Sequence, residues 1–288
     1  MKYGYFVRSV LDYPKIRDLT LKVERLGFES AHVNDHFFKG YLEAMMLTSS
    51  LAVETSKIKL GHIVLCNSFR NPTYLAKMVC TLDNISNGRA LFWIGAGWNE
   101  DEYKGYGYPF SSAKQRVDEL EESITIYKKL FTEKESNFEG KFWKIQKNTN
   151  FPKPIQRPYP QLVLGTIGKR MTDIACREAD GINLVNIKPD DLPGHINKLK
   201  NSLKKYKRDI SEFEISCCSV IILEERGELK ERFDPNGIYY TGSTENLKEK
   251  MDTLEELGID KMMLWGVNKT AQSEIDDPLE TFANEVMK

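Results

Sequence analysis

Short apolar runs alternate along the chain with longer segments in which apolar positions recur every three or four residues. Short runs rich in β-branched and aromatic residues predict buried strands, and the longer spacing predicts amphipathic helices. The pattern predicts strands at 2–7, 30–34, 57–65, 89–95, 161–165, 181–186, 214–223 and 261–265. It predicts a helix after each strand, at 13–26, 41–55, 72–85, 114–131, 170–177, 191–206, 244–257 and 277–287.

Strands that alternate with helices predict a parallel sheet built from β-α units. Eight such units predict a (β/α)8 TIM barrel with insertions, and a doubly wound open sheet is the alternative. We expect a single domain over residues 1–288 with an insertion at about 137–160. Within it, 137–145 predicts a short hairpin, and the prolines of 153–160 predict an irregular connection.

The charge balance gives no indication of nucleic-acid binding, because the formal net charge is −1. Residues 198–208 are rich in lysine but follow a helical pattern, which favours a solvated helix face over a polyanion site. The chain contains no apolar run near the roughly 18 residues that a membrane span requires. We therefore expect neither nucleic acid nor membrane as a partner.

The cysteine pattern argues against a disulfide framework and against a thiolate zinc site. There are 5 cysteines, scattered and without a Cys-x-x-Cys pair. The chain also opens on a strand-like run rather than a secretion signal. Both observations fit a reducing compartment, and we expect a cytoplasmic protein.

Two glycines, Gly95 and Gly97, end the predicted strand 89–95, and an acidic, aromatic loop is expected to follow them. Glycines at a strand end let the backbone turn sharply or approach a ligand closely. The segment differs from a dinucleotide fingerprint, because Glu100 stands where the third glycine is needed. The carboxyl end of this strand is therefore predicted to face a large or flat ligand.

His36 lies at the end of the predicted strand 30–34, directly after Asp35. A histidine beside a carboxylate can transfer a proton or orient a cofactor. The alternative is that Asp35 caps a helix and His36 covers the barrel rim. His32 and His36 have the spacing of a metal pair, but the pair straddles a strand end, so we predict no metal site.

Two further strand ends carry candidate residues. Cys66 could be a nucleophile, although a cysteine there is more often a small apolar residue. Gly165-Thr166-Ile167-Gly168 could bind a phosphate through backbone N–H groups at a helix start, and a tight turn is the alternative. The chain has no P-loop and no Gly-x-Ser-x-Gly elbow, so neither a Walker-type site nor a serine hydrolase is supported.

Taken together, these motifs resemble the bacterial-luciferase-like superfamily of flavin- and deazaflavin-dependent oxidoreductases. The resemblance spans essentially the whole chain and is most specific between Arg70 and Phe110. It is carried by Asn34-Asp35-His36, Phe69-Arg70-Asn71-Pro72, Ile85-Ser86-Asn87-Gly88-Arg89, the segment from Gly95 to Glu100 with Glu102, and Gly165 to Gly168.

The resemblance implies a barrel that binds FMN or the deazaflavin coenzyme F420 across the strand ends, and a homodimer. It implies a non-prolyl cis peptide near Ile63-Val64. It also implies catalytic roles for His36 and Asp35. The implied cofactor-binding residues are Asp35, His36, Ile63, Val64, Cys66, Gly95, Gly97, Trp98, Gly165, Thr166, Ile167 and Gly168.

The Gly-Trp-Asn-Glu-x-Glu segment is most similar to the F420-dependent branch. The resemblance therefore implies hydride transfer between F420 and a small organic substrate. Trp98 stands where F420-dependent sugar-phosphate dehydrogenases have a glutamate, and Gly40 stands near where they have a tryptophan, which argues against a sugar phosphate. A monooxygenase that uses reduced FMN is the alternative, and a non-catalytic flavin-binding protein is the second.

Overall fold

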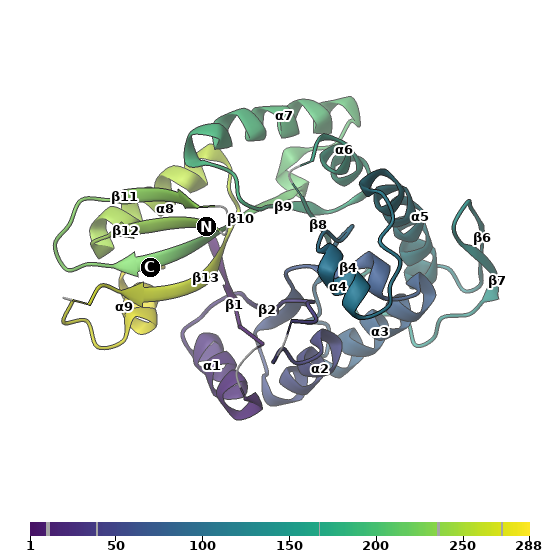
Figure 1. The fold of residues 1–288 in the computed structure, drawn as a ribbon, viewed down its shortest axis with the longest axis horizontal. Helices are drawn as coiled ribbons and strands as arrows, with labels where there is room; N and C mark the ends of the chain where they lie inside the picture. The colour runs from purple at the N-terminus through teal and green to yellow at the C-terminus, as the bar shows by residue number, and fades with distance from the viewer. Residues whose placement is uncertain (10–11, 39, 167, 235–236, 272) are drawn as a thin grey trace. The chain divides into compact units, whose positions relative to one another are not determined.

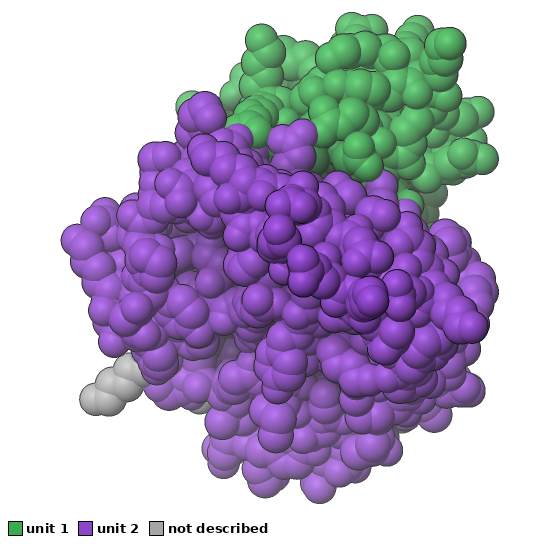
Figure 2. All heavy atoms as spheres, turned by 90° about the vertical axis from the view of Figure 1, so that its right-hand side faces the viewer, with its two compact units in different colours: residues 1–7, 19–32, 163–288 green, residues 8–18, 33–162 purple. Residues whose placement is uncertain are grey.

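We describe a computed structural model of the chain, covering all residues except 10–11, 39, 167, 235–236 and 272. The described residues form two compact units, coloured separately in Figure 2. Unit 1 comprises residues 1–7, 19–32 and 163–288, and unit 2 comprises residues 8–18 and 33–162. The expectation of a single domain stays a prediction.

Unit 1 is built on a mostly parallel sheet (Figure 1). Neighbouring strands follow the order β2-β1-β13-β10-β9-β8, and β12 also pairs with β10. Their bounds are β1 (Lys2–Phe6), β2 (Ser30–Val33), β8 (Leu162–Gly165), β9 (Gly181–Leu184), β10 (Glu214–Leu223), β12 (Gly237–Gly242) and β13 (Lys261–Lys269). The helices that follow strands here are α6 (Lys169–Glu178), α7 (Leu192–Lys205), α8 (Thr244–Leu257) and α9 (Pro278–Glu285).

Unit 2 holds the next part of the strand and helix alternation. Helix α1 (Tyr13–Arg25) begins in unit 2 and ends in unit 1. The remaining elements are α2 (Ala44–Glu54), β3 (Lys59–His62), β4 (Leu65–Cys66), α3 (Pro72–Ile85), β5 (Phe92–Gly95), α4 (Glu100–Gly105) and α5 (Ala113–Thr132). Strands β4 and β5 are parallel, with Cys66 opposite Gly95. Each predicted strand and helix therefore has a counterpart in the structure.

The core of unit 2 forms around β5, whose residues from Phe92 to Ile94 are fully buried. The ring of Phe92 meets Tyr127 and Phe131 of α5 edge to face, with centroids 5.0 and 5.8 Å apart. Such pairs are more favourable than their buried area alone predicts. This packing fixes the direction in which β5 leaves the core, and hence the position of Gly95 and Gly97.

The segment predicted as an insertion contains a hairpin, and its role as an insertion stays a prediction. Strands β6 (Ser136–Glu139) and β7 (Lys144–Asn148) pair antiparallel. The carboxylate of Glu122 on α5 accepts three backbone N–H groups of their turn, from Lys141, Phe142 and Trp143. One side chain therefore holds the hairpin turn on α5.

Two elements differ from the expectation. The loop predicted after Gly97 contains α4, whose N-terminus is capped by Asn99 and carries three acidic residues in its first turn. Negative charge near a helix N-terminus is stabilising, so the acidic run favours a helix start. The connection after β10 contains β11 (Lys230–Asp234), antiparallel to β12.

Among the described residues, no helix combines the length and apolar character needed to cross a bilayer.

Candidate functional site

Asp35 lies two residues beyond β2, and its carboxylate is held by three hydrogen bonds within unit 2. Oδ2 accepts the backbone N–H of Cys66 at 2.8 Å and Nη1 of Arg70 at 2.6 Å, and Oδ1 accepts Nη2 of Arg70 at 2.8 Å. The side chain is 2% exposed. Asp35 therefore ties the end of β2 to the end of β4, and its oxygens are already engaged.

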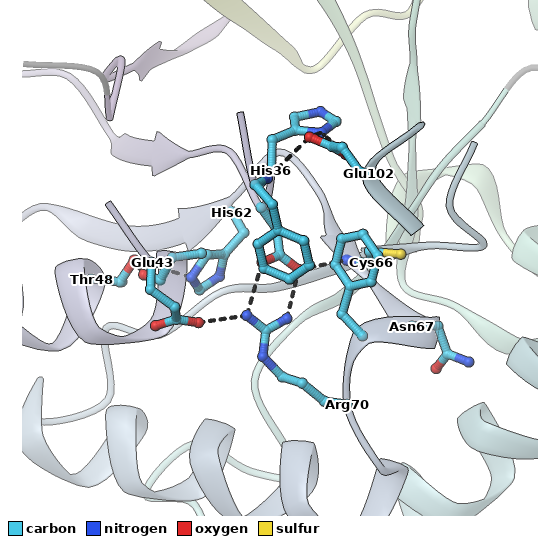
Figure 3. A network of polar contacts seen from close by, with 12 residues as sticks. His36, Glu43, Thr48, His62, Cys66, Asn67, Arg70 and Glu102 are labelled. Carbon is cyan, nitrogen blue, oxygen red and sulfur yellow. Dashed lines mark hydrogen bonds and ion pairs between the residues drawn. The ribbon is translucent and has the colours of Figure 1, made fainter. Parts of the chain in front are cut away.

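Arg70 bridges two carboxylates (Figure 3). Beyond its paired bonds to Asp35, Nη2 donates to Glu43 Oε1 at 2.6 Å. Glu43 also caps α2 by accepting the backbone N–H of Met46. Burial opposes the charge of Arg70, but the hydrogen bonds with Asp35 and Glu43 outweigh it and raise the pKa of the guanidinium. A permanently charged fork at this point fixes the loops after β2 and β4.

His36 pairs with Glu102 rather than with its neighbour Asp35 (Figure 3). Nδ1 lies 2.8 Å from Oε2 of Glu102, and the backbone N–H of Phe37 donates to Oε1 at 3.0 Å. The Glu102 side chain is 5% exposed. Because a carboxylate only accepts, the proton of the ring lies on Nδ1. In the neutral ring, Nε2 is then left as a proton acceptor.

His62 ends β3 and is completely enclosed. Thr48 donates its hydroxyl to the carbonyl of Ala44, so its oxygen accepts Nε2–H of His62 at 3.0 Å. Burial lowers the pKa of His62 to about 4, so the ring is neutral near pH 7. The peptide bond that follows, Ile63-Val64, is cis, which confirms the predicted position.

Cys66, Gly97 and Tyr103 are in contact at the ends of β4 and β5. The sulfur of Cys66 lies 3.2 Å from the Tyr103 hydroxyl. Gly97 has φ +79°, and a Cβ built there would lie 1.9 Å from that hydroxyl and 2.7 Å from the sulfur. The structure thus requires glycine at 97 to admit Tyr103. Burial raises the pKa of the Cys66 thiol to about 11, which argues for the apolar alternative over a nucleophile.

The carbonyl of Gly97 is also fixed, by Nε of Arg116 at 3.2 Å. The guanidinium of Arg116 lies 4.2 Å from the centre of the Phe110 ring. Arg116 itself comes from the first turn of α5. The strand end around Gly97 is therefore held from both sides, by Tyr103 and by Arg116, as a pre-organised ligand site requires.

Aromatic faces lie open beside His36. Phe38 stacks on the imidazole at 5.0 Å between ring centroids, and Trp98 meets it edge to face at 5.9 Å. Phe38 is 42% exposed and Trp98 69%. Large exposed aromatic side chains above a network of charged groups are typical of a site for a flat ligand. These residues fit an isoalloxazine-type ring and a substrate beside it.

The predicted site residues of unit 2 therefore lie on adjoining segments, but the sequence did not identify two further residues that hold them. Arg70 holds Asp35, and Glu102 holds His36. The sequence contained no signal for the role of Glu102, because its burial is seen only in the structure and 66 residues separate it from His36.

The predicted phosphate loop lies in unit 1, between β8 and α6. The backbone N–H of Thr166 donates to the carbonyl of Asn183 at 3.0 Å, and that of Gly168 donates to the Thr166 hydroxyl at 3.0 Å. Gly168 is the N-cap of α6, and Gly165 ends β8. Ile167 lies outside the described residues.

Comparison with known proteins finds one family model and a set of relatives. The family model described as luciferase-like monooxygenase matches residues 1–232. The chain is 30% identical over 178 residues to the FMNH2-dependent dimethylsulfone monooxygenase of Pseudomonas putida, covering 60% of this chain and 49% of that protein. It is 30% identical over 200 residues to the F420-dependent glucose-6-phosphate dehydrogenase of Kineococcus radiotolerans, covering 67% and 58%. The chain thus spans about half the length of the curated relatives it matches.

Among solved structures, the chain is similar to an F420-dependent secondary alcohol dehydrogenase in complex with an F420-acetone adduct. The TM-score is 0.81 at 18% identity, and the match covers 99% of this chain and 96% of that one. At this identity the likeness shows the fold alone. It confirms the predicted (β/α)8 barrel and excludes the open doubly wound sheet.

Proposed function

Because the chain belongs to the luciferase-like monooxygenase family, we propose that it is an oxidoreductase transferring a hydride between coenzyme F420 and a small organic substrate. The names of two relatives state that one depends on FMNH2 and the other on F420. The observation that carries the proposal is the His36–Glu102 pair beside the open faces of Phe38 and Trp98. It combines an acid–base group with a surface for a flat ring.

The proposed cofactor site follows from the strand ends. When bound, F420 accepts or supplies a hydride. Trp98 and the backbone around Gly97 would contact the ring. The phosphate role of the loop from Gly165 to Gly168 in unit 1 stays a separate prediction. Asp35 acts as a positioning residue, because its carboxylate is occupied by Arg70 and the Cys66 amide.

We propose that His36 accepts and donates the proton of the reaction. When a substrate alcohol is oxidised, its C–H hydrogen would pass as hydride to F420, and its O–H proton passes to Nε2 of His36. The carbonyl product, the reduced cofactor and the protonated imidazole then balance the reaction. Glu102 stabilises the imidazolium through the Nδ1–H bond, as the third group of a triad does. In the reverse direction His36 supplies the same proton to a carbonyl oxygen.

The substrate side of the site is aromatic and uncharged at Trp98. We therefore propose a neutral alcohol or carbonyl compound and not glucose 6-phosphate, the substrate named for one relative. An alternative function is a monooxygenase that uses reduced FMN, supported by the similarity to the dimethylsulfone enzyme.

Titration of protein fluorescence with F420 and with FMN separates these functions. We expect F420 to bind at least tenfold more tightly, and a panel of neutral alcohols to reduce it while glucose 6-phosphate does not. The matched variant His36→Asn should keep binding and lose turnover. Tight FMN binding with oxygen uptake in the presence of a flavin reductase supports the monooxygenase instead. Failure to bind either cofactor refutes both functions.

We also propose a homodimer formed through α2 and α3. From Ala44 to Val53, α2 carries no charge, and yet Met46 and Val53 are 71% and 72% exposed. Tyr74 and Ile85 are exposed on the neighbouring α3. Large apolar side chains exposed on an uncharged helix are typical of a surface that a partner covers, and depletion of charge is typical of an interface core. Light scattering should give a dimer, and Met46→Glu with Val53→Glu should give a monomer.

A further inference from the structure

Arg116 is a buried cation that holds backbone carbonyls and pairs with no acid. The residue is 8% exposed. Its Nε donates to the carbonyl of Gly97 at 3.2 Å, and Nη1 donates to the carbonyl of Ser111. Over the part of the chain that the structure describes, no carboxylate forms an ion pair with it. Because arginine is rarely buried without an anionic partner, its bond to the Gly97 carbonyl calls for a functional explanation.

The bond from Arg116 also sets the direction of the next N–H group. The peptide between Gly97 and Trp98 is trans. In a planar trans peptide the C=O and N–H bonds point to opposite sides. The carbonyl of Gly97 points at Arg116, and the N–H of Trp98 therefore points away from it. Within the described residues, no group accepts this N–H, so it is available to a ligand.

Contacts at the Cα of Gly97 keep this peptide from turning. A Cβ there would lie 1.9 Å from the Tyr103 hydroxyl and 2.7 Å from the Cys66 sulfur. The peptide is therefore held at its oxygen by Arg116 and at its Cα by Tyr103. The N–H that is fixed in this way belongs to Trp98, whose indole meets the His36 ring edge to face at 5.9 Å between centroids.

We propose that the backbone N–H of Trp98 donates a hydrogen bond to the substrate oxygen, and that Arg116 is the positioning residue that aims it. The inference deepens the proposed function and rests on it. The oxygen of an alcohol gains negative charge as its proton passes to Nε2 of His36, and a carbonyl oxygen gains it in the reverse direction. A donor that is fixed in advance stabilises this charge without reorganisation, as in an oxyanion hole.

Nuclear magnetic resonance of protein carrying isotope-labelled tryptophan tests the donor without any turnover. The chain has 4 tryptophans, and the backbone signal of Trp98 is identified by its loss in Trp98→Phe. The probe is cyclohexanone, a neutral ketone, added with and without F420. We expect the Trp98 amide proton to move downfield and saturate, while the signal of Trp143 in the β6–β7 turn stays in place. A Trp98 signal that moves under neither condition overturns the inference.

An ester in place of the Trp98 amide removes the N–H and keeps the indole. The α-hydroxy analogue of tryptophan, incorporated at position 98, makes this change. We expect kcat with a neutral alcohol to fall about 100-fold, the effect of one oxyanion donor, while KM and the affinity for F420 change less than about threefold.

The matched control is the same ester at Asn99. Its N–H follows the carbonyl of Trp98, which accepts no hydrogen bond from any described group, so nothing fixes its direction. This ester should change kcat less than about twofold. Equal effects of the two esters overturn the inference. A loss of F420 affinity with an unaltered kcat also overturns it, because the N–H would then bind the cofactor.

A combined variant tests the positioning role of Arg116. Arg116→Met keeps an apolar contact with Phe110 and removes the donors, and kcat should fall about 10- to 100-fold because the Trp98 N–H is misplaced. In the Arg116→Met background the ester at 98 should cost less than about threefold more, because groups that act as a unit are not additive. Arg116→Lys keeps one donor and should retain more activity than Arg116→Met. An ester effect of full size in both backgrounds, or equal losses for the two Arg116 variants, overturns the positioning role.

The failure of this inference is distinguishable from that of the proposed function. Turnover of alcohols with F420 that the Trp98 ester leaves unchanged refutes the donor and leaves the function. A ketone-dependent shift of the Trp98 signal in a protein that binds neither F420 nor FMN refutes the function and leaves the donor.

Discussion

Replacing Gly97 by alanine tests whether the glycine is required by the protein itself. The residue has φ +79°, a conformation that costs an alanine about 1–2 kcal/mol. The added Cβ would also lie 1.9 Å from the Tyr103 hydroxyl and 2.7 Å from the Cys66 sulfur. Overpacking of this kind costs about 1–3 kcal/mol more. We expect Gly97→Ala to lower the free energy of unfolding by about 2–5 kcal/mol.

Urea denaturation measures this loss. With an m value of about 3 kcal/mol per M, the midpoint should fall by about 1 M. The control is Gly105→Ala in α4, where the new Cβ meets nothing within 4 Å and should cost less than about 0.5 kcal/mol. Adding Tyr103→Phe to Gly97→Ala should restore part of the loss, because the closest contact is with the hydroxyl oxygen. A loss below about 0.5 kcal/mol for Gly97→Ala would refute the reasoning.

Three further predictions concern the charged network. Arg70→Ala should lower the free energy of unfolding by about 3–5 kcal/mol, because it leaves the buried Asp35 carboxylate unpaired, and Arg70→Lys should lose less; equal urea midpoints would contradict this. His62 has a folded pKa of about 4, below its ordinary 6.5, so the stability it contributes is present above pH 6.5 and lost as pH falls through 4, by up to about 3 kcal/mol. In the His62→Gln variant, the urea midpoint should fall less between pH 7 and 4.5 than in the unaltered protein. The same fall in both proteins would argue against this role of His62. Glu102→Ala should reduce turnover about 10- to 100-fold through loss of its charged hydrogen bond to His36, and Glu102→Gln should retain more; full activity of Glu102→Ala would remove the pair from the mechanism.

Much of the fold could be predicted because its elements are long and regularly patterned. The bounds predicted for α3, β10 and α8 agree with the structure at both ends. Helix α4 was missed because its 6 residues are too few for an apolar period to show. Strand β11 was missed because four of its five residues are exposed, so it has no alternation of buried and exposed positions.

The location of the site could be predicted from the sequence, but the pairing of its side chains could not. Asp35 and Cys66 could be placed at strand ends, and the structure joins them through one hydrogen bond. The sequence suggested Asp35 as the partner of His36, but adjacent residues leave a strand in different directions. The partner is Glu102, which lies on α4, a helix that the hydrophobic pattern did not reveal. Gly97, expected to admit a ligand, is also required by the Tyr103 hydroxyl.

The central claim is that the end of unit 2 formed by His36, Gly97 and Trp98 holds a deazaflavin ring. A crystal structure of the protein soaked with F420 tests it most directly. We predict the ring against Trp98, its edge at the backbone of Gly97, and Nε2 of His36 facing the reacting carbon across the substrate space. A ring bound elsewhere, with His36 and Trp98 still open to solvent, would contradict the account.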